Sequence, residues 1–189
     1  MNGHLLMVDH RDSYTHILLD YFRQLEWQTS CVQSEDLHLE YVNNFDFLVL
    51  SPGFGRPEDK RHTLTLIREY AGKPTIGICL GHQLLALAHG GSVRRAHRPL
   101  HGIMTQMIWE QGHDLNGFSG KQKIMHYHSW VVNDMPKGAR ALGYCDQTDA
   151  IMGMNHRALN FIGWQFHPES VGTEKGLELL QASIRYVLD

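Results

Sequence analysis

Hydrophobic residues follow two alternating patterns in the first half of the chain. Four short runs have the length and the apolar or β-branched content of strands: 5–8, 29–32, 47–50 and 75–78. Segments 14–25 and 62–70 instead repeat apolar residues at helical spacing. In the first helix, one face is predicted to carry Ile17, Leu18, Tyr21, Phe22 and Leu25. Strands that alternate with helices predict an α/β fold with a mostly parallel open sheet between two helical layers.

The pattern changes after about residue 92. Short alternating runs such as 124–132 and 161–166 lie between clusters of Gly, Asn and Asp, which predicts an added region of antiparallel and mixed strands. A final helix is predicted to begin near residue 173, with Leu177, Leu180, Ile184 and Val187 on one face. The polar, glycine-containing segment 114–122 is predicted to be a mobile loop. Without a repeat or linker, residues 1–189 are expected to form a single domain.

Composition narrows the class of protein. A net charge of −3 and the absence of a basic run argue against nucleic acid as the main partner. No apolar run is long enough to span a bilayer, and the first residues lack the basic start and cleavage site of a signal peptide. Three cysteines, Cys31, Cys79 and Cys145, are too few for a disulfide framework. We therefore expect a cytoplasmic protein without a membrane partner.

One cysteine lies in a motif typical of catalytic nucleophiles. The segment 77–81 reads Gly-Ile-Cys-Leu-Gly between a strand pattern and a helix pattern. This Gly-x-nucleophile-x-Gly arrangement is a nucleophile elbow, in which a tight turn exposes the central side chain above a sheet. The backbone amides that open the next helix favour a thiolate at Cys79.

A base for this cysteine is available near the other end of the chain. His167, in the segment His-Pro-Glu, can exchange a proton with the Cys79 sulfur. Glu169 can hold the imidazole in one tautomer and stabilise the imidazolium. An isolated cysteine or histidine is more often structural, but the elbow together with His-Pro-Glu favours a Cys-His-Glu triad.

Taken together, the motifs give the chain a family resemblance. It resembles the class I (triad) glutamine amidotransferases, in particular the small subunit, component II, of anthranilate synthase and aminodeoxychorismate synthase. The matching motifs extend almost end to end: Asp12–Thr15, Ser51–Gly55, Gly77–Gln83, His101–Gly102, Tyr127–Ser129 and Gln165–Ser170. The resemblance implies the family's three-layer, flavodoxin-like form of the predicted fold.

The elbow and the resemblance together suggest how a substrate would be held. The Ser-Pro-Gly turn ends a strand, and the backbone N–H groups of its Gly53–Gly55 loop suit an oxyanion together with the N–H of Leu80. The resemblance implies that the substrate is L-glutamine, which Cys79 attacks to form a γ-glutamyl thioester. It also implies binding of the amino-acid end of glutamine by Gln83 and by the backbone at Ser129 and Trp130.

Some residues depart from the family pattern or allow other chemistry. Phe54 stands in the oxyanion loop where the family usually has Pro, Ile103 where it has Lys, and Trp130 where it has Leu. These changes affect substrate affinity and partner contacts more than the reaction class. His126 and His128 share one face of a strand and suit zinc, but no third ligand is evident. We expect neither a metal nor another cofactor.

The acceptor of the ammonia is not specified by the motifs. The sequence contains no ATP-binding loop, and the resemblance implies a separate chorismate-utilising synthase large subunit, serving tryptophan synthesis, folate synthesis or both. One alternative is a glutaminase for another acceptor, such as a secondary-metabolite chorismate aminase or a guanylate-forming synthase. Another is a catalytically silent regulatory subunit, which the intact triad disfavours.

Overall fold

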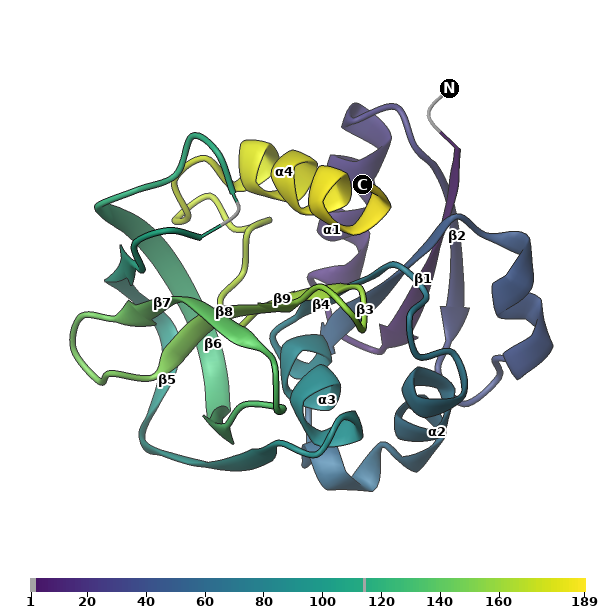
Figure 1. Ribbon diagram of the computed structural model, residues 1–189, viewed down its shortest axis with the longest axis horizontal. Helices are drawn as coiled ribbons and strands as arrows, with labels where there is room; N and C mark the ends of the chain where they lie inside the picture. The colour runs from purple at the N-terminus through teal and green to yellow at the C-terminus, as the bar shows by residue number, and fades with distance from the viewer. Residues whose placement is uncertain (1–2, 114) are drawn as a thin grey trace.

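The computed structural model describes residues 3–113 and 115–189 as a sheet between two layers of helices (Figure 1). The sheet has nine strands in the order β2-β1-β3-β4-β9-β8-β7-β5-β6. The strands are β1 (His4–His10), β2 (Gln28–Gln33), β3 (Phe47–Gly53), β4 (Thr75–Ile78), β5 (Ser92–Trp109), β6 (Lys121–Asp134), β7 (Arg140–Cys145), β8 (Ile151–His156) and β9 (Phe161–Trp164).

Helices cover both faces of the sheet. Helices α1 (Thr15–Gln24) and α4 (Gly176–Leu188) lie on one face, and α2 (Arg61–Glu69) and α3 (Leu80–Ala88) lie on the other (Figure 1). Two short 3₁₀ helices, η1 (Leu39–Asn44) and η2 (Pro57–Asp59), belong to the connections on either side of β3. This three-layer arrangement confirms the predicted α/β fold.

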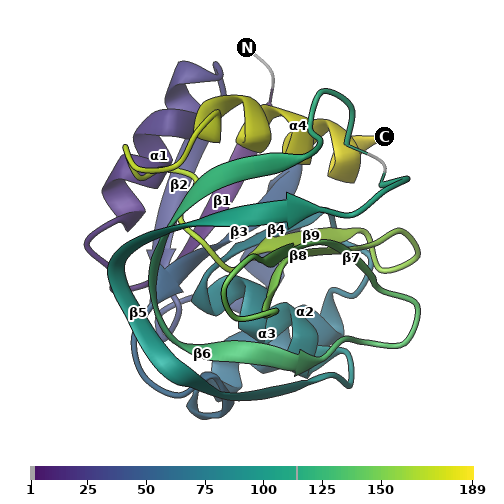
Figure 2. The same cartoon turned by 90° about the vertical axis from the view of Figure 1, so that its left-hand side faces the viewer.

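The sheet changes from parallel to antiparallel at β9. Strands β2, β1, β3, β4 and β9 pair in parallel, as the strand–helix alternation predicts. From β9 onward, β8, β7, β5 and β6 pair antiparallel, which confirms the added region after residue 92. Figure 2 shows the long strands β5 and β6 curving around this end of the molecule. Their pairing register shifts between Arg95 and Leu100.

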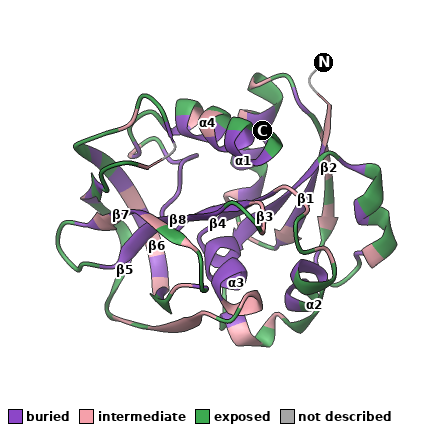
Figure 3. Ribbon diagram, viewed as in Figure 1, coloured by how far each residue is buried: buried purple, intermediate pink, exposed green. Residues whose placement is uncertain are grey.

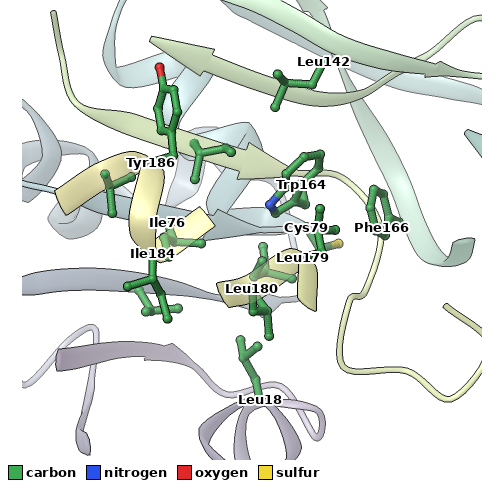
Figure 4. Packing of buried hydrophobic residues seen from close by; sticks show 14 of the residues in the cluster. Leu18, Ile76, Cys79, Leu142, Trp164, Phe166, Leu179, Leu180, Ile184 and Tyr186 are labelled. Atoms are coloured by element: carbon green, nitrogen blue, oxygen red, sulfur yellow. The ribbon is translucent and has the colours of Figure 1, made fainter. Parts of the chain in front are cut away.

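Two apolar clusters, one on each face of the sheet, form the core (Figure 3). Leu5 and Met7 of β1 belong to the cluster under α1 and α4, whereas Leu6 and Val8 belong to the one under α2 and α3. Alternate side chains of a strand point to opposite faces, so a strand buried on both sides is apolar at every position. Figure 4 shows α4 packed on the first cluster.

Details of three predicted elements differ from the sequence pattern. Ile17 is exposed, because Leu19 instead joins Leu18 and Phe22 in the core. The last helix begins at Gly176 and buries Leu179. Of the predicted loop 114–122, residues 121 and 122 already belong to β6, and Asp114 lies outside the described residues. The mobility of this loop stays a prediction.

Candidate active site

The turn between β4 and α3 holds Cys79 in a conformation that few side chains adopt. Its φ of 51° and ψ of −99° lie outside the regions that L-residues favour. A Cβ on Gly77 would approach the backbone of Gly81 to 2.6 Å, and a Cβ on Gly81 would approach the Leu50 carbonyl oxygen to 2.3 Å. Both glycines are therefore required by packing, and the nucleophile elbow is present as the motif predicts.

Hydrogen bonds fix Cys79 against the neighbouring strand. Its N–H donates to the carbonyl oxygen of Trp164 at 2.7 Å. The side-chain amide of Gln165 donates to the Cys79 sulfur at 3.9 Å, and the cysteine is only 3% exposed. Trp164, Phe166 and Leu179 surround this side of the elbow in Figure 4. The thiol thus lies on a rigid part of the fold, next to the segment that continues to His167.

His167 and Glu169 form a buried pair after β9. The Nδ1 atom of His167 lies 2.7 Å from Oε1 of Glu169, and the two residues are each 1% exposed. The His167 N–H donates to the Met125 carbonyl oxygen at 3.1 Å, and the Thr173 hydroxyl donates to the His167 carbonyl oxygen at 2.7 Å. The first of these bonds attaches the His167 backbone to β6, and the second attaches it to the segment before α4.

The surroundings of His167 favour its charged form. Burial alone would lower the pKa of His167, but the Glu169 carboxylate and the Cys79 sulfur outweigh burial and raise this pKa well above 6.5. No described side chain makes a well-aligned hydrogen bond to the His167 Nε2 atom, although the Cys79 side chain is close enough to help raise the pKa of this histidine. Cys79, His167 and Glu169 are therefore brought together in the order that a triad requires, with Nε2 left free for the nucleophile or a substrate.

Other buried histidines have lowered pKa values, which favour the neutral form. Burial lowers the pKa of His10 and His126 to about 4, and that of His82 and His128 to about 3. His126 and His128 lie within 2.9 Å of each other through Nδ1 and Nε2. Within residues 3–113 and 115–189, no three His, Cys, Asp or Glu side chains are grouped so as to hold a metal ion.

The loop after β3 approaches the elbow closely. A Cβ on Gly53 would lie 2.5 Å from Cδ2 of Leu80 and 2.6 Å from Cβ of His10, so the loop packs this closely because residue 53 is glycine. Gly55 has a φ of +93°, and Phe54 between the two glycines is 65% exposed. The Lys60 ammonium lies 5.2 Å from the centre of the Phe54 ring. The loop thus lines the same cavity as Cys79, and most of the Phe54 side chain faces solvent.

A cavity of about 850 Å³ opens above the cysteine. Its lining includes these residues predicted from the sequence: Gly53, Phe54, Gly55, Cys79, Gln83, Ser129 and Trp130. Gln83 is 3% exposed, and its amide donates to the Trp130 carbonyl oxygen at 2.8 Å and to Oε1 of Gln165 at 3.2 Å. The polar end of Gln83 is therefore fixed at the wall of the cavity.

Sequence reasoning missed several residues of this cavity. Arg56 and Arg95 line it, although neither arginine is among the site residues expected from the motifs. The Arg56 guanidinium lies 5.7 Å from the centre of the Trp130 ring and joins the two walls. Tyr14 and Tyr127 also line it, and their positions inside two quoted motifs were a usable signal. Ile103 is 40% exposed and is not among the lining residues.

Comparisons with known proteins agree with this geometry. Residues 6–186 match the family model described as glutamine amidotransferase class-I. Anthranilate synthase component 2 of Pseudomonas aeruginosa is 36% identical over 190 residues, which cover 96% of this chain and 94% of the relative. Aminodeoxychorismate synthase component 2 of Escherichia coli is 36% identical over 181 residues, which cover 93% of this chain and 96% of the relative.

The fold is also found among solved structures. A glutamine amidotransferase from Thermotoga maritima superposes with a TM-score of 0.81 at 19% identity, with 100% of each chain covered. At this identity the likeness shows the fold alone. No helix in the described part of the chain is long and apolar enough to cross a membrane.

Proposed function

Because the chain belongs to the class-I glutamine amidotransferase family, we propose that it hydrolyses L-glutamine to glutamate and ammonia. The ammonia would be used by a chorismate-utilising synthase subunit on a separate chain. The observation that carries this proposal is the elbow cysteine at the floor of a cavity, beside the buried His167–Glu169 pair. Catalytic roles follow for Cys79, His167 and Glu169.

The first half of the reaction forms a thioester. The Cys79 thiolate attacks the side-chain amide carbon of glutamine while its proton resides on His167. The tetrahedral oxyanion accepts hydrogen bonds from backbone N–H groups at Gly53 and Leu80. His167 then gives its proton to the leaving nitrogen, the C–N bond breaks, and ammonia leaves a γ-glutamyl thioester. Glu169 stabilises the imidazolium through the 2.7 Å bond.

The second half releases glutamate. His167, now neutral, takes a proton from a water molecule that attacks the thioester carbonyl carbon. The C–S bond breaks, and Cys79 returns to the thiolate beside the imidazolium. Gln83 and the backbone at Ser129 and Trp130 bind the amino-acid end of glutamine, and the Gly53–Gly55 loop contacts the substrate beside them. The fixed amide of Gln83 supports this assignment.

The relatives support a partner for the ammonia. Their names, component 2 of anthranilate synthase and of aminodeoxychorismate synthase, indicate that each works with another component. Ammonia released into water at neutral pH becomes unreactive ammonium, so a useful transfer requires a protected path to the acceptor. We infer that the product is anthranilate, 4-amino-4-deoxychorismate or both, made in the cytoplasm.

A reconstitution experiment tests the proposal. Glutaminase activity is measured for the chain alone and with the large subunit of anthranilate synthase or of aminodeoxychorismate synthase from the same organism. We expect low activity alone, stimulation by at least one subunit, and loss of activity in Cys79→Ser but not in the control Cys145→Ser. The glutaminase assignment fails if wild type and Cys79→Ser are equally inactive in every mixture. The acceptor assignment fails if neither subunit stimulates an active chain.

A further inference from the structure

Two tyrosine rings enclose the catalytic imidazole. The Tyr14 ring centre lies 5.2 Å from that of His167 at an interplanar angle of 63°, and the Tyr127 ring centre lies 5.1 Å away at 86°. The two tyrosine rings are 4.9 Å from each other. Edge-to-face contacts at these distances are favourable for aromatic rings. His167 therefore packs against two rings that also pack against each other.

The two tyrosines come from different parts of the fold. Tyr14 is the residue that precedes α1, and its N–H donates to Oδ1 of Asp12 at 2.8 Å. Tyr127 lies in β6, two residues after Met125, whose carbonyl oxygen holds the His167 backbone. The two tyrosines are half-buried and line the cavity, whereas His167 is 1% exposed. The tyrosines thus separate the imidazole from the open part of the cavity.

Tyr127 also affects the ionisation of Tyr14. The Tyr127 side chain, together with partial burial, raises the pKa of Tyr14 to about 12. Tyr14 is consequently neutral at every pH at which the enzyme would work, and it does not exchange protons with substrate. The ring contacts link the loop before α1 to β6 across the face of His167. The pair acts through its rings.

We propose that Tyr14 and Tyr127 are positioning residues. They hold the His167 ring in line with Glu169 and keep water away from the hydrogen bond between His167 and Glu169. An ion pair screened from water is stronger, because water competes for both partners and raises the local dielectric constant. A ring that cannot rotate also keeps Nε2 directed at the reacting atoms. The kinetic part of this inference rests on the proposed glutaminase function, whereas the shielding part does not.

The proton between His167 Nδ1 and Glu169 Oε1 provides a direct readout. A shielded proton in a 2.7 Å bond gives a downfield ¹H resonance that exchanges slowly with water. We expect Tyr14→Ala to speed this exchange about tenfold or more and to lower kcat about 10–100-fold at a KM within about threefold, as expected when a catalytic group is displaced. Tyr14→Phe keeps the ring and should retain the resonance and most of kcat.

A matched control separates this effect from general loss of stability. Tyr21→Ala removes a partly buried tyrosine from the same α1 segment and should leave the exchange rate and kcat unchanged. If Tyr14→Ala does not fold, Tyr127→Leu tests the second ring by the same measurements. The proposal is overturned if folded Tyr14→Ala or Tyr127→Leu keeps the wild-type exchange rate and kcat, or if Tyr21→Ala produces equal changes. A wild type with a protected proton but no glutaminase activity would refute the proposed function alone.

Discussion

Replacing Glu169 by glutamine removes the negative charge beside His167 while keeping a side chain of nearly the same size. The carboxylate lies 2.7 Å from Nδ1 in a buried site, so no water replaces it in the variant. His167 is then a buried imidazole whose charge has no partner. We expect its pKa to fall, because the burial that Glu169 now outweighs acts alone.

The other buried histidines indicate the size of this effect. His126 has its pKa lowered to about 4, chiefly by burial. A fall from the ordinary 6.5 to that value corresponds to about 3 kcal/mol against the imidazolium. If this energy is lost from the thiolate–imidazolium pair, the rate of thioester formation falls about 10²-fold. His167→Ala, which removes the proton carrier itself, should cost more, towards 10⁴-fold.

Steady-state glutaminase assays of Glu169→Gln and His167→Ala measure these effects in the presence of the stimulating subunit. Iodoacetamide alkylation of Cys79 at pH 6 and pH 9 adds a measurement without substrate, and Glu169→Gln should slow it more at the lower pH. The control is Glu174→Gln, which changes an exposed glutamate near the same segment and should leave the glutaminase and alkylation rates unchanged. A Glu169→Gln variant within threefold of wild type, or more damaging than His167→Ala, would refute the reasoning.

Three further predictions concern the elbow, the buried histidines and the oxyanion loop. Gly81→Ala should lower the free energy of unfolding in urea by about 3 kcal/mol, because its Cβ would meet the Leu50 carbonyl oxygen. In the control Gly72→Ala the new Cβ meets open space, so the positive φ alone should lower the free energy of unfolding by only about 1–2 kcal/mol. Equal losses in the two variants would refute the packing argument. The free energy of unfolding should fall as pH drops from about 6.5 to 4, because unfolding lets the four neutral histidines His10, His82, His126 and His128 bind protons. His82→Leu should reduce the slope of the free energy of unfolding against pH by up to about 1.4 kcal/mol per pH unit. An unchanged slope would contradict this prediction. Phe54→Pro should raise the partner-free glutaminase rate about two- to fivefold by restricting the loop, and a loss of rate would show that the Phe54 N–H is needed.

Periodicity predicted the arrangement of elements because strands and helices of this fold bury different sets of positions. The run at 47–50 is apolar at every residue, since β3 is covered on both faces. The exposure of Ile17 could not be predicted in this way. Leu19 competes for the same core, and only the angle at which α1 packs on the sheet decides between them. The length of β5 could also not be predicted from the sequence, because its many exposed positions lack an alternating apolar pattern.

The placement of Cys79, His167 and Glu169 was predictable because each of them lies in a motif with its own local geometry. The elbow requires Gly77 and Gly81, and His167 and Glu169 are two residues apart in the chain. The contributions of Arg56 and Arg95 were not predictable. Arg56 reaches the cavity from the connection after β3 and Arg95 reaches it from β5, and nothing in the local sequence indicates which way an exposed arginine points.

Labelling with a glutamine-like electrophile tests the central claim, that Cys79 carries the γ-glutamyl intermediate. Cys31 is exposed, whereas Cys79 is 3% exposed at the floor of the cavity, so accessibility alone would direct the label to Cys31. We predict that peptide mapping finds the label on Cys79, that glutamine protects this site, and that glutaminase activity is lost in proportion to labelling. Loss of activity with the label on Cys31 or Cys145 and Cys79 unmodified would contradict the account.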